Sequence, residues 1–270
     1  MVNFILIKII QIYILLSTVL LWVACNNKEV QTTATSKSIH YDFSEMDIFF
    51  KKYVTDGKVN YIKVKNDKAL DKIINDVKSI EPYLIEDGNE RLSFWINAYN
   101  IYTIKLITEY YPLNSITDIL DITGTDPWSI EFIEMAGGRK FSLDEIEKKI
   151  IIPKYKDPRV HYALVCAAES CPVIIPEAYL PEKLDVQLNR QAKIFLNDKK
   201  KNYLVKEDNE LNLSKIYRWY GKDFINKDSS VINHVIQYLN NNDKNFIVEN
   251  GTDDISYLEY SWELNDFKEK

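Results

Sequence analysis

Apolar residues recur at helical spacing in several parts of the chain. In 67–80 they stand three and four positions apart, which predicts an amphipathic surface helix. The stretch 91–111 is apolar on most sides and is followed by Pro112, so we predict a buried helix that ends there. A Ser-x-x-Glu pattern at the start of 142–150 is typical of a capping box and predicts a third helix. Further helices are expected at 184–196 and 230–239.

Fewer segments have the composition of strands. The β-branched stretch 58–64 follows an Asp-Gly turn signal, and the apolar stretch 159–166 follows Asp-Pro. The short stretches 203–205 and 210–213 predict a hairpin, and 246–248 is a further strand candidate. Helices outnumber strands in this pattern, which favours a helix-rich α+β fold around a small, mainly antiparallel sheet.

The N-terminal segment has the pattern of a secretion signal. Lys8 is followed by an uncharged apolar run from Ile9 to Ala24, shorter than the roughly 20 residues that cross a bilayer. The residues before Cys25 resemble the lipobox of bacterial lipoproteins, with Trp22 in place of the usual Leu. This resemblance predicts a signal peptide over 1–24 and a lipid anchor on Cys25. The alternative is an uncleaved N-terminal membrane helix.

The residues after Cys25 predict a tether and then a single folded body. The stretch 25–38 is polar and rich in Thr and Ser, so it cannot bury enough apolar surface to fold. The body, 39–270, has no Pro/Gly/Ser-rich break and no internal repeat, which favours one domain. Lys28 and Glu29 resemble the charged tag that sends some lipoproteins to the outside of the outer membrane. We therefore expect an outer-membrane lipoprotein of a bacterial cell envelope, either periplasmic or surface-exposed.

Composition excludes several classes of function. Of the 270 residues, 46% are hydrophobic and 27% are charged, which is an ordinary globular balance. The 34 Lys and Arg residues stand against 40 Asp and Glu, so no overall positive charge predicts nucleic-acid binding. Neither GxGxxG nor GxxxxGK[ST] occurs, and we expect no cofactor.

Three segments resemble bacterial proteins that carry the domain of unknown function 547. They are 94–100 (FWINAYN), 161–172 (HYALVCAAESCP) and 213–224 (LSKIYRWYGKDF). Supporting motifs in the same order lie at 57–61, 141–150 and 260–265. The resemblance extends over nearly all of the body, but it implies no activity, because that of the family is unassigned. A distant likeness to papain-like and transglutaminase-like thiol hydrolases is a fold-level analogy.

Two thiols and one histidine are the main candidates for chemistry. Cys166 and Cys171 stand five residues apart and can form a disulfide in an oxidising compartment, or remain inert structural thiols. Alternatively, Cys171 is a nucleophile with His161 as its base. If 159–166 is extended, His161 lies about 16 Å from Cys166 and on the opposite face of the strand, which disfavours that pairing. His161 is otherwise expected to be a core imidazole bonded to a backbone carbonyl.

Other polar residues are candidates for supporting roles. Asn97 and Asn100 share one face of an otherwise apolar helix, where they either tie the helix to a loop or orient a catalytic imidazole or an oxyanion. Papain-like and transglutaminase-like enzymes place their nucleophilic Cys at the start of a central helix, whereas the helix predicted over 91–111 contains Asn97 and no Cys. Trp219, Tyr220 and Asp223 either line a pocket, with Asp223 as an orienting carboxylate, or pack in the core.

These residues predict two alternative functions. The first is a thiol-dependent hydrolase or acyl transferase that acts on an envelope peptide or amide, with His161, Cys171, Asn97, Asn100 and Asp223 as its site. The second is a glycan- or peptide-binding module without chemistry, which the 18 Tyr and 5 Trp favour. Two Cys and one nearby His fall short of a zinc ligand set, and no HExxH occurs, so no metal site is expected.

Overall fold

A long buried helix runs through the centre of the fold. The computed structural model describes residues 38–252 and 254–268, so the predicted signal peptide and nearly all of the tether lie outside it. Helix α5 (Gly88–Tyr110) begins where the Asp87 carboxylate accepts a hydrogen bond from the backbone of Glu90 at 2.7 Å, and it ends before Pro112. Its side chains are buried along most of its length, which confirms the helix predicted over 91–111.

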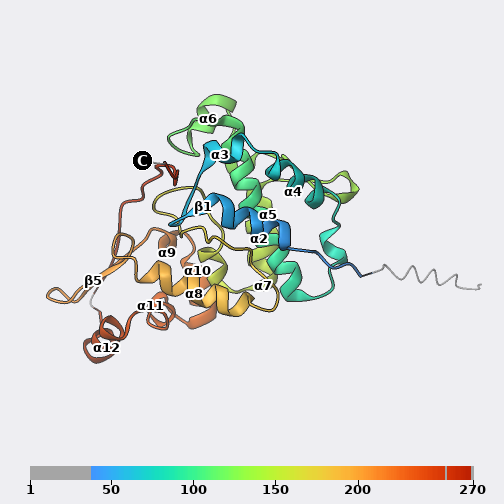
Figure 1. Ribbon diagram of the computed structural model, residues 1–270. Coiled ribbons are helices and arrows are strands. Elements are labelled where there is room, and N and C mark those ends of the chain that lie inside the picture. The colour runs from blue at the N-terminus through green and yellow to red at the C-terminus, as the bar shows by residue number, and fades with distance from the viewer. Residues whose placement is uncertain (1–37, 253, 269–270) are drawn as a thin grey trace, which may run out of the picture. The chain divides into compact units, whose positions relative to one another are not determined.

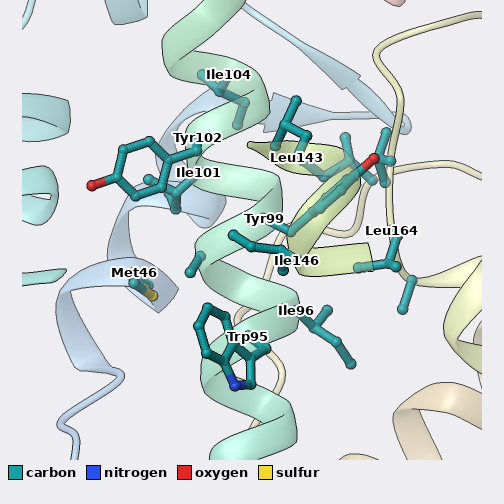
Figure 2. Close-up of a cluster of buried hydrophobic side chains, with 14 of the residues drawn as sticks. Met46, Trp95, Ile96, Tyr99, Ile101, Tyr102, Ile104, Leu143, Ile146 and Leu164 are labelled. Atoms are coloured by element: carbon teal, nitrogen blue, oxygen red, sulfur yellow. The ribbon is translucent and has the colours of Figure 1, made fainter. Parts of the chain in front are cut away.

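Helices from the first part of the chain pack on α5 (Figure 1). They include α3 (Tyr61–Lys65) and α4 (Ala69–Lys78), and α2 (Ser44–Tyr53) packs in turn on α3 and α4. The apolar face predicted within 67–80 is the buried face of α4. Figure 2 shows Tyr102 on one side of α5 and Tyr99 on the other, with Leu143 and Ile146 beside Tyr99. Both sides of α5 therefore contribute to the core.

The later part of the chain forms a second hydrophobic cluster around the buried Tyr162. Helix α8 (Leu184–Leu196) has the predicted bounds and contacts the 3₁₀ segment η5 (Pro158–Tyr162). The remaining helices of this part are α9 (Ile216–Trp219), α10 (Gly221–Asp228), α11 (Val231–Val235) and α12 (Asn241–Asn250). The helix predicted over 230–239 is shorter than expected, and the Ser230 side chain caps its start.

The strands are short and form small separate sheets. Strands β1 (Val54–Thr55) and β2 (Lys58–Val59) pair antiparallel, as do β3 (Ile133–Glu134) and β4 (Lys140–Phe141). The predicted hairpin is confirmed as β5 (Tyr203–Val205) and β6 (Glu210–Leu213), with Leu204 opposite Leu211. Strand β7 (Asp254–Tyr257), which was not predicted, pairs parallel to β6. The chain thus has a helix-rich α+β fold.

The connecting segments complete the architecture. Short helical segments are η1 (Pro82–Leu84), α6 (Asp118–Thr123), η2 (Pro127–Ser129), η3 (Ala136–Gly138), the π-helix η4 (Glu145–Ile151) and α7 (Ile152–Tyr155). The predicted cap at Ser142 is half confirmed, because its hydroxyl accepts from the backbone of Glu145 at 3.1 Å, whereas the Glu145 side chain binds Arg139. The helix predicted over 142–150 is therefore present, but most of it is wound as a π-helix.

Three strand predictions are wrong. The stretch 159–166 is not extended: Pro158 begins the 3₁₀ turn η5, and the Asp157 carboxylate caps it. Only the start of 58–64 is a strand, because the Asn60 side chain caps helix α3. The stretch 246–248 lies inside α12. A short apolar run fits a buried helix as well as a buried strand, so periodicity alone did not separate them.

Candidate functional site

A cavity of about 380 Å³ brings together segments that are far apart in the sequence. Its walls come from α5, η2, η4, η5, the loop 164–172, α9 with the following Tyr220, and the C-terminal segment 260–262. His161, Cys166, Cys171, Trp219 and Tyr220 all line it. Most of the residues that the sequence singled out therefore share one cavity.

Two buried amides of α5 hold the loops of the site in place. Asn97 accepts from the backbone of Tyr179 at 2.9 Å and donates to its carbonyl at 2.8 Å. Asn100 accepts from the backbone of Val165 at 3.0 Å and donates to the Ala163 carbonyl at 2.9 Å. Neither amide lines the cavity. Both amides therefore tie the helix to a loop, because their hydrogen bonds go to backbone groups of the loops.

The loop that carries both cysteines is also fixed by the C-terminal segment. Ala167 does not line the cavity. Its φ of 59° is a left-handed backbone conformation, which costs energy for a residue with a Cβ. The backbone of Asn265 donates to its carbonyl at 3.0 Å, and Ala168 bridges to Leu264. The backbone of Glu169 donates to the Glu263 carbonyl at 2.8 Å. These bonds hold the strained loop in its conformation.

His161 lines the cavity and forms a hydrogen-bonded pair with Asp223, which does not line it. The Nε2 atom of His161 lies 2.9 Å from Oδ2 of Asp223, and the His161 side chain is almost fully buried. Its ring packs against that of Tyr220, with centroids 4.1 Å apart. An Nε2 that donates to the carboxylate leaves Nδ1 as the ring's proton acceptor. The hydrogen bond to Asp223 therefore fixes the orientation of the His161 ring.

The two cysteines are free thiols in direct contact. Their Sγ atoms lie 2.6 Å apart, with the Cys166 thiol donating to Cys171. The backbone N–H of Cys166 also donates to the Cys171 sulfur, at 2.9 Å. The hydroxyl of Tyr260 lies 3.2 Å from the Cys166 sulfur. Cys171 is therefore the acceptor of two hydrogen bonds from one residue.

This arrangement separates the acidities of the two thiols. Burial raises the pKa of Cys166 well above its usual value, and the hydrogen bond to Cys171 raises it further. Burial also acts to raise the pKa of Cys171, whereas the two hydrogen bonds from Cys166 lower it. The Tyr260 hydroxyl and the Lys201 ammonium lower that pKa further, so it lies below the usual value. Cys171 is thus the thiol that ionises first.

The separation of His161 from the thiols was expected for an extended chain only. Residues 158–162 instead form a 3₁₀ turn, which rises only about 2 Å per residue. As a result, His161 and both cysteines line the same cavity. Within 38–252 and 254–268, no hydrogen bond joins His161 to Cys171, whose bonding partner is Cys166.

Aromatic rings form one side of the site. Trp219 packs on Tyr260 with centroids 4.8 Å apart, and Tyr260 packs on Trp262 at 4.7 Å. Trp128 lies edge-on to Trp262 at 5.4 Å. Nearly half of the Trp219 side chain is exposed, at 48%. We call Trp128, Trp219, Tyr260 and Trp262 the aromatic cluster.

Sequence reasoning missed several residues of the site. Tyr260 and Trp262 belong to the motif at 260–265, which was noted only for its resemblance. Glu147 and Tyr99 were not singled out, although both line the cavity. The sequence does contain a signal for Glu147, because its position between Ile146 and Ile150 predicts that it lies on the buried face of the helix. No group of His, Cys, Asp or Glu within the described parts of the chain is arranged to hold a metal ion.

The fold and cavity define a helix-rich α+β protein with a buried thiol pair beside a His–Asp pair. Residues 86–196 match the family model described as protein of unknown function, DUF547. The match includes α5, η5 and both cysteines, whereas the similar motifs at 213–224 and 260–265 lie outside it. No curated protein and no solved structure matches the chain. No helix in the described residues is long and apolar enough to span a membrane.

Proposed function

We propose that the protein is a thiol-dependent hydrolase or acyl transferase that acts on a peptide or amide of the cell envelope. The observation that carries the proposal is a shared cavity in which Cys171, the more acidic of two thiols, accompanies an imidazole oriented by Asp223. A thiolate nucleophile, a base and an orienting carboxylate are the parts that thiol acyl transfer needs. Asn97 and Asn100 support the reaction by positioning the loops.

In the first step His161 takes the proton of Cys171, and the thiolate attacks the substrate carbonyl carbon. The new C–S bond turns the carbonyl into a tetrahedral oxyanion. Collapse of this intermediate breaks the C–N bond, and the leaving amine takes the proton from the imidazolium of His161. Asp223 stabilises the imidazolium between these transfers, because its carboxylate accepts the Nε2 hydrogen bond.

In the second step the thioester on Cys171 is cleaved. Water in a hydrolase, or an amine in a transferase, gives a proton to His161 and attacks the acyl carbon. The C–S bond breaks, and the sulfur of Cys171 leaves as a thiolate. The backbone N–H and the thiol of Cys166 stabilise the charge on that sulfur in both steps, because both donate to it.

Alkylation of the unreduced full chain with iodoacetamide tests the mechanism. We expect Cys171 to react before Cys166, with an apparent pKa below the usual thiol value. His161→Gln is expected to slow this reaction. Cys166→Ser is the matched control for the identity of the labelled thiol, because it removes the other sulfur and keeps a hydroxyl donor. Labelling of both thiols only after reduction contradicts a resting nucleophile.

A second candidate function is a binding module for a glycan or peptide, without chemistry. The aromatic cluster favours it, because exposed rings such as Trp219 stack on sugars and on peptide side chains. A binding module tolerates a disulfide between Cys166 and Cys171, whereas the thiol mechanism does not. Retention of glycan or peptide binding by the oxidised protein, with no thioester formed by the reduced protein, favours this second function.

We also propose that the chain is a lipoprotein tethered to the envelope through Cys25. The support is the lipobox-like sequence, which lies outside the described residues. Cys25→Ala is expected to block processing and incorporation of a radiolabelled fatty acid, and globomycin is expected to block processing of the wild type. Unchanged processing of the variant contradicts the proposal.

A further inference from the structure

Glu147 is a buried carboxylate that the proposed mechanism does not use. It is 6% exposed, and it lies on η4 together with the buried apolar residues Ile146 and Ile150. The Tyr99 hydroxyl donates to its Oε2 at 3.1 Å. No Lys, Arg or His that the structure describes forms an ion pair with it. A buried carboxylate without a cation is costly, and a positively charged ligand group would offset that cost.

Glu147 lines the same cavity as the two thiols. Burial raises the pKa of Tyr99 well above its usual value, and the charges of Glu147, Cys166 and Cys171 raise it further. Burial also raises the pKa of Tyr220, and Glu147, Cys166 and Cys171 raise it further. Tyr99 and Tyr220 line the same cavity as the carboxylate and the two sulfurs. A group bound at Glu147 therefore occupies the cavity that holds the sulfur proposed to react.

The charges of the cavity wall favour a cation. Three carboxylates line it, Asp126, Asp144 and Glu147, against the single ammonium of Lys148. Lys148 is paired with Asp144, at 2.8 Å. Asp126 is exposed and accepts only the backbone N–H of Trp128, at 3.0 Å, among the bonds of the described chain. The wall therefore has an excess of negative charge that its own side chains leave uncompensated.

The remaining lining is also suited to a cation. Ammonium and guanidinium groups bind over the faces of Trp and Tyr, most strongly where water is excluded. The aromatic cluster supplies three Trp rings and one Tyr ring to the same cavity as Glu147. Glu147 also lies on a π-helix, a rare winding that is frequent at functional sites. Charge, rings and local backbone thus point to the same class of ligand.

We propose that Glu147 and the aromatic cluster form a subsite that binds an ammonium or guanidinium group of the substrate. This inference deepens the proposed function, because it names the substrate as a peptide or amide with a cationic group close to the cleaved bond. It rests on the proposed function for the reaction. The subsite itself requires only the cavity and its charge. It therefore also exists if the protein binds without chemistry.

Calorimetric titration of the full chain, in a mild detergent, with three small probes tests this subsite. Nα-acetyl-lysine amide carries a side-chain ammonium, norleucine amide carries only an α-ammonium, and Nα-acetyl-norleucine amide is neutral. We expect at least one cationic probe to bind about tenfold more tightly than the neutral probe. The better of the two cationic probes identifies the source of the cation. Equal binding of all three, or no binding up to about 10 mM, overturns the inference.

Glu147→Gln is the decisive variant. It removes the charge and keeps an oxygen that accepts from Tyr99, so we expect the preference for cationic probes to be lost. Glu145→Gln is the matched control, because Glu145 lies on the same helix, pairs with Arg139 and does not line the cavity. A preference that survives in Glu147→Gln overturns the inference.

Two further measurements keep the test independent of folding and of the reaction. If Glu147→Gln does not fold, hydrogen exchange of wild-type 142–151 is compared with and without probes. Protection by a cationic probe alone supports the subsite, and protection by none or by the neutral probe equally contradicts it. Cys171→Ser is expected to keep the preference. Failure of iodoacetamide to find a reactive Cys171 then removes the thiol mechanism and leaves the subsite intact.

Discussion

At the scale of single residues, the acidity and orientation of the side chains in the site depend on their hydrogen-bond partners. Cys171 is acidified because the thiol and backbone N–H of its neighbour Cys166 both point at its sulfur. His161 has a defined tautomer because Asp223 accepts from one ring nitrogen. A second His–Asp pair, His234 with Asp228, lies in the other hydrophobic cluster and does not line the cavity. The two pairs allow a controlled comparison.

Asp223→Asn is expected to reduce the rate of Cys171 alkylation at neutral pH by at least about tenfold, because the charge that stabilises the imidazolium is lost. The rate is measured with iodoacetamide over a range of pH. Asp228→Asn is the control, since it makes the same change at the pair bonded to His234. Equal losses in the two variants indicate a structural role for Asp223, and no loss in either excludes Asp223 from the mechanism.

At the scale of elements, the site exists because α5 fixes the loops around it. Asn97 and Asn100, one helical turn apart, each make two hydrogen bonds to loop backbone. The 3₁₀ turn η5 then brings His161 to the cavity, which an extended segment would not do. The amides of α5 therefore hold the loops in place, while the loops and turns contain the residues proposed to react.

Asn97→Ala is expected to lower the free energy of unfolding by about 2–4 kcal/mol, because it leaves a buried N–H and a buried carbonyl of Tyr179 without partners. Denaturant unfolding measures the change. The control is Asn250→Ala, since Asn250 is exposed and binds only a carbonyl of its own helix. Its expected effect is within about 0.5 kcal/mol. A similar loss in both variants argues against the tie between α5 and the loop.

At the scale of the whole molecule, the buried His234 is expected to make stability depend on pH. His234 lies between Asp228, at 2.6 Å from Nδ1, and the Tyr162 hydroxyl, at 2.9 Å from Nε2. Burial lowers its pKa below the usual value of 6.5, although Asp228 opposes that change. The folded state therefore binds the proton less readily than the unfolded chain.

The free energy of unfolding is expected to fall as pH decreases from about 7.5 through the usual histidine pKa, because protonation of His234 favours the unfolded chain. The measurement is denaturant unfolding at several pH values. His234→Gln is expected to flatten this slope. His40→Gln is the control with the opposite sign, because the hydrogen bond to Glu90 raises the pKa of His40. An unchanged slope in His234→Gln contradicts the assignment.

The sequence by itself determined the elements whose cause is local. The helix α5, the amphipathic α4 and the hairpin of β5 and β6 follow from periodicity and turn residues along one stretch of chain. The same is true of the cap at Ser142, because a cap joins residues three positions apart. The helix-rich α+β class followed from these elements.

Only the tertiary structure decided what depends on contacts between distant segments. The run 159–166 begins in the 3₁₀ turn η5, which packs on α8, and continues as a loop rather than as a strand. β7 exists through its pairing with β6, and His161 meets Asp223 across 62 positions of sequence. The acidity of Cys171 and the burial of Glu147 also arise from neighbours in space. The hydrophobic and polar pattern along the chain does not identify such neighbours. Burial and nearby charges change a pKa according to distances in the folded structure, not along the sequence.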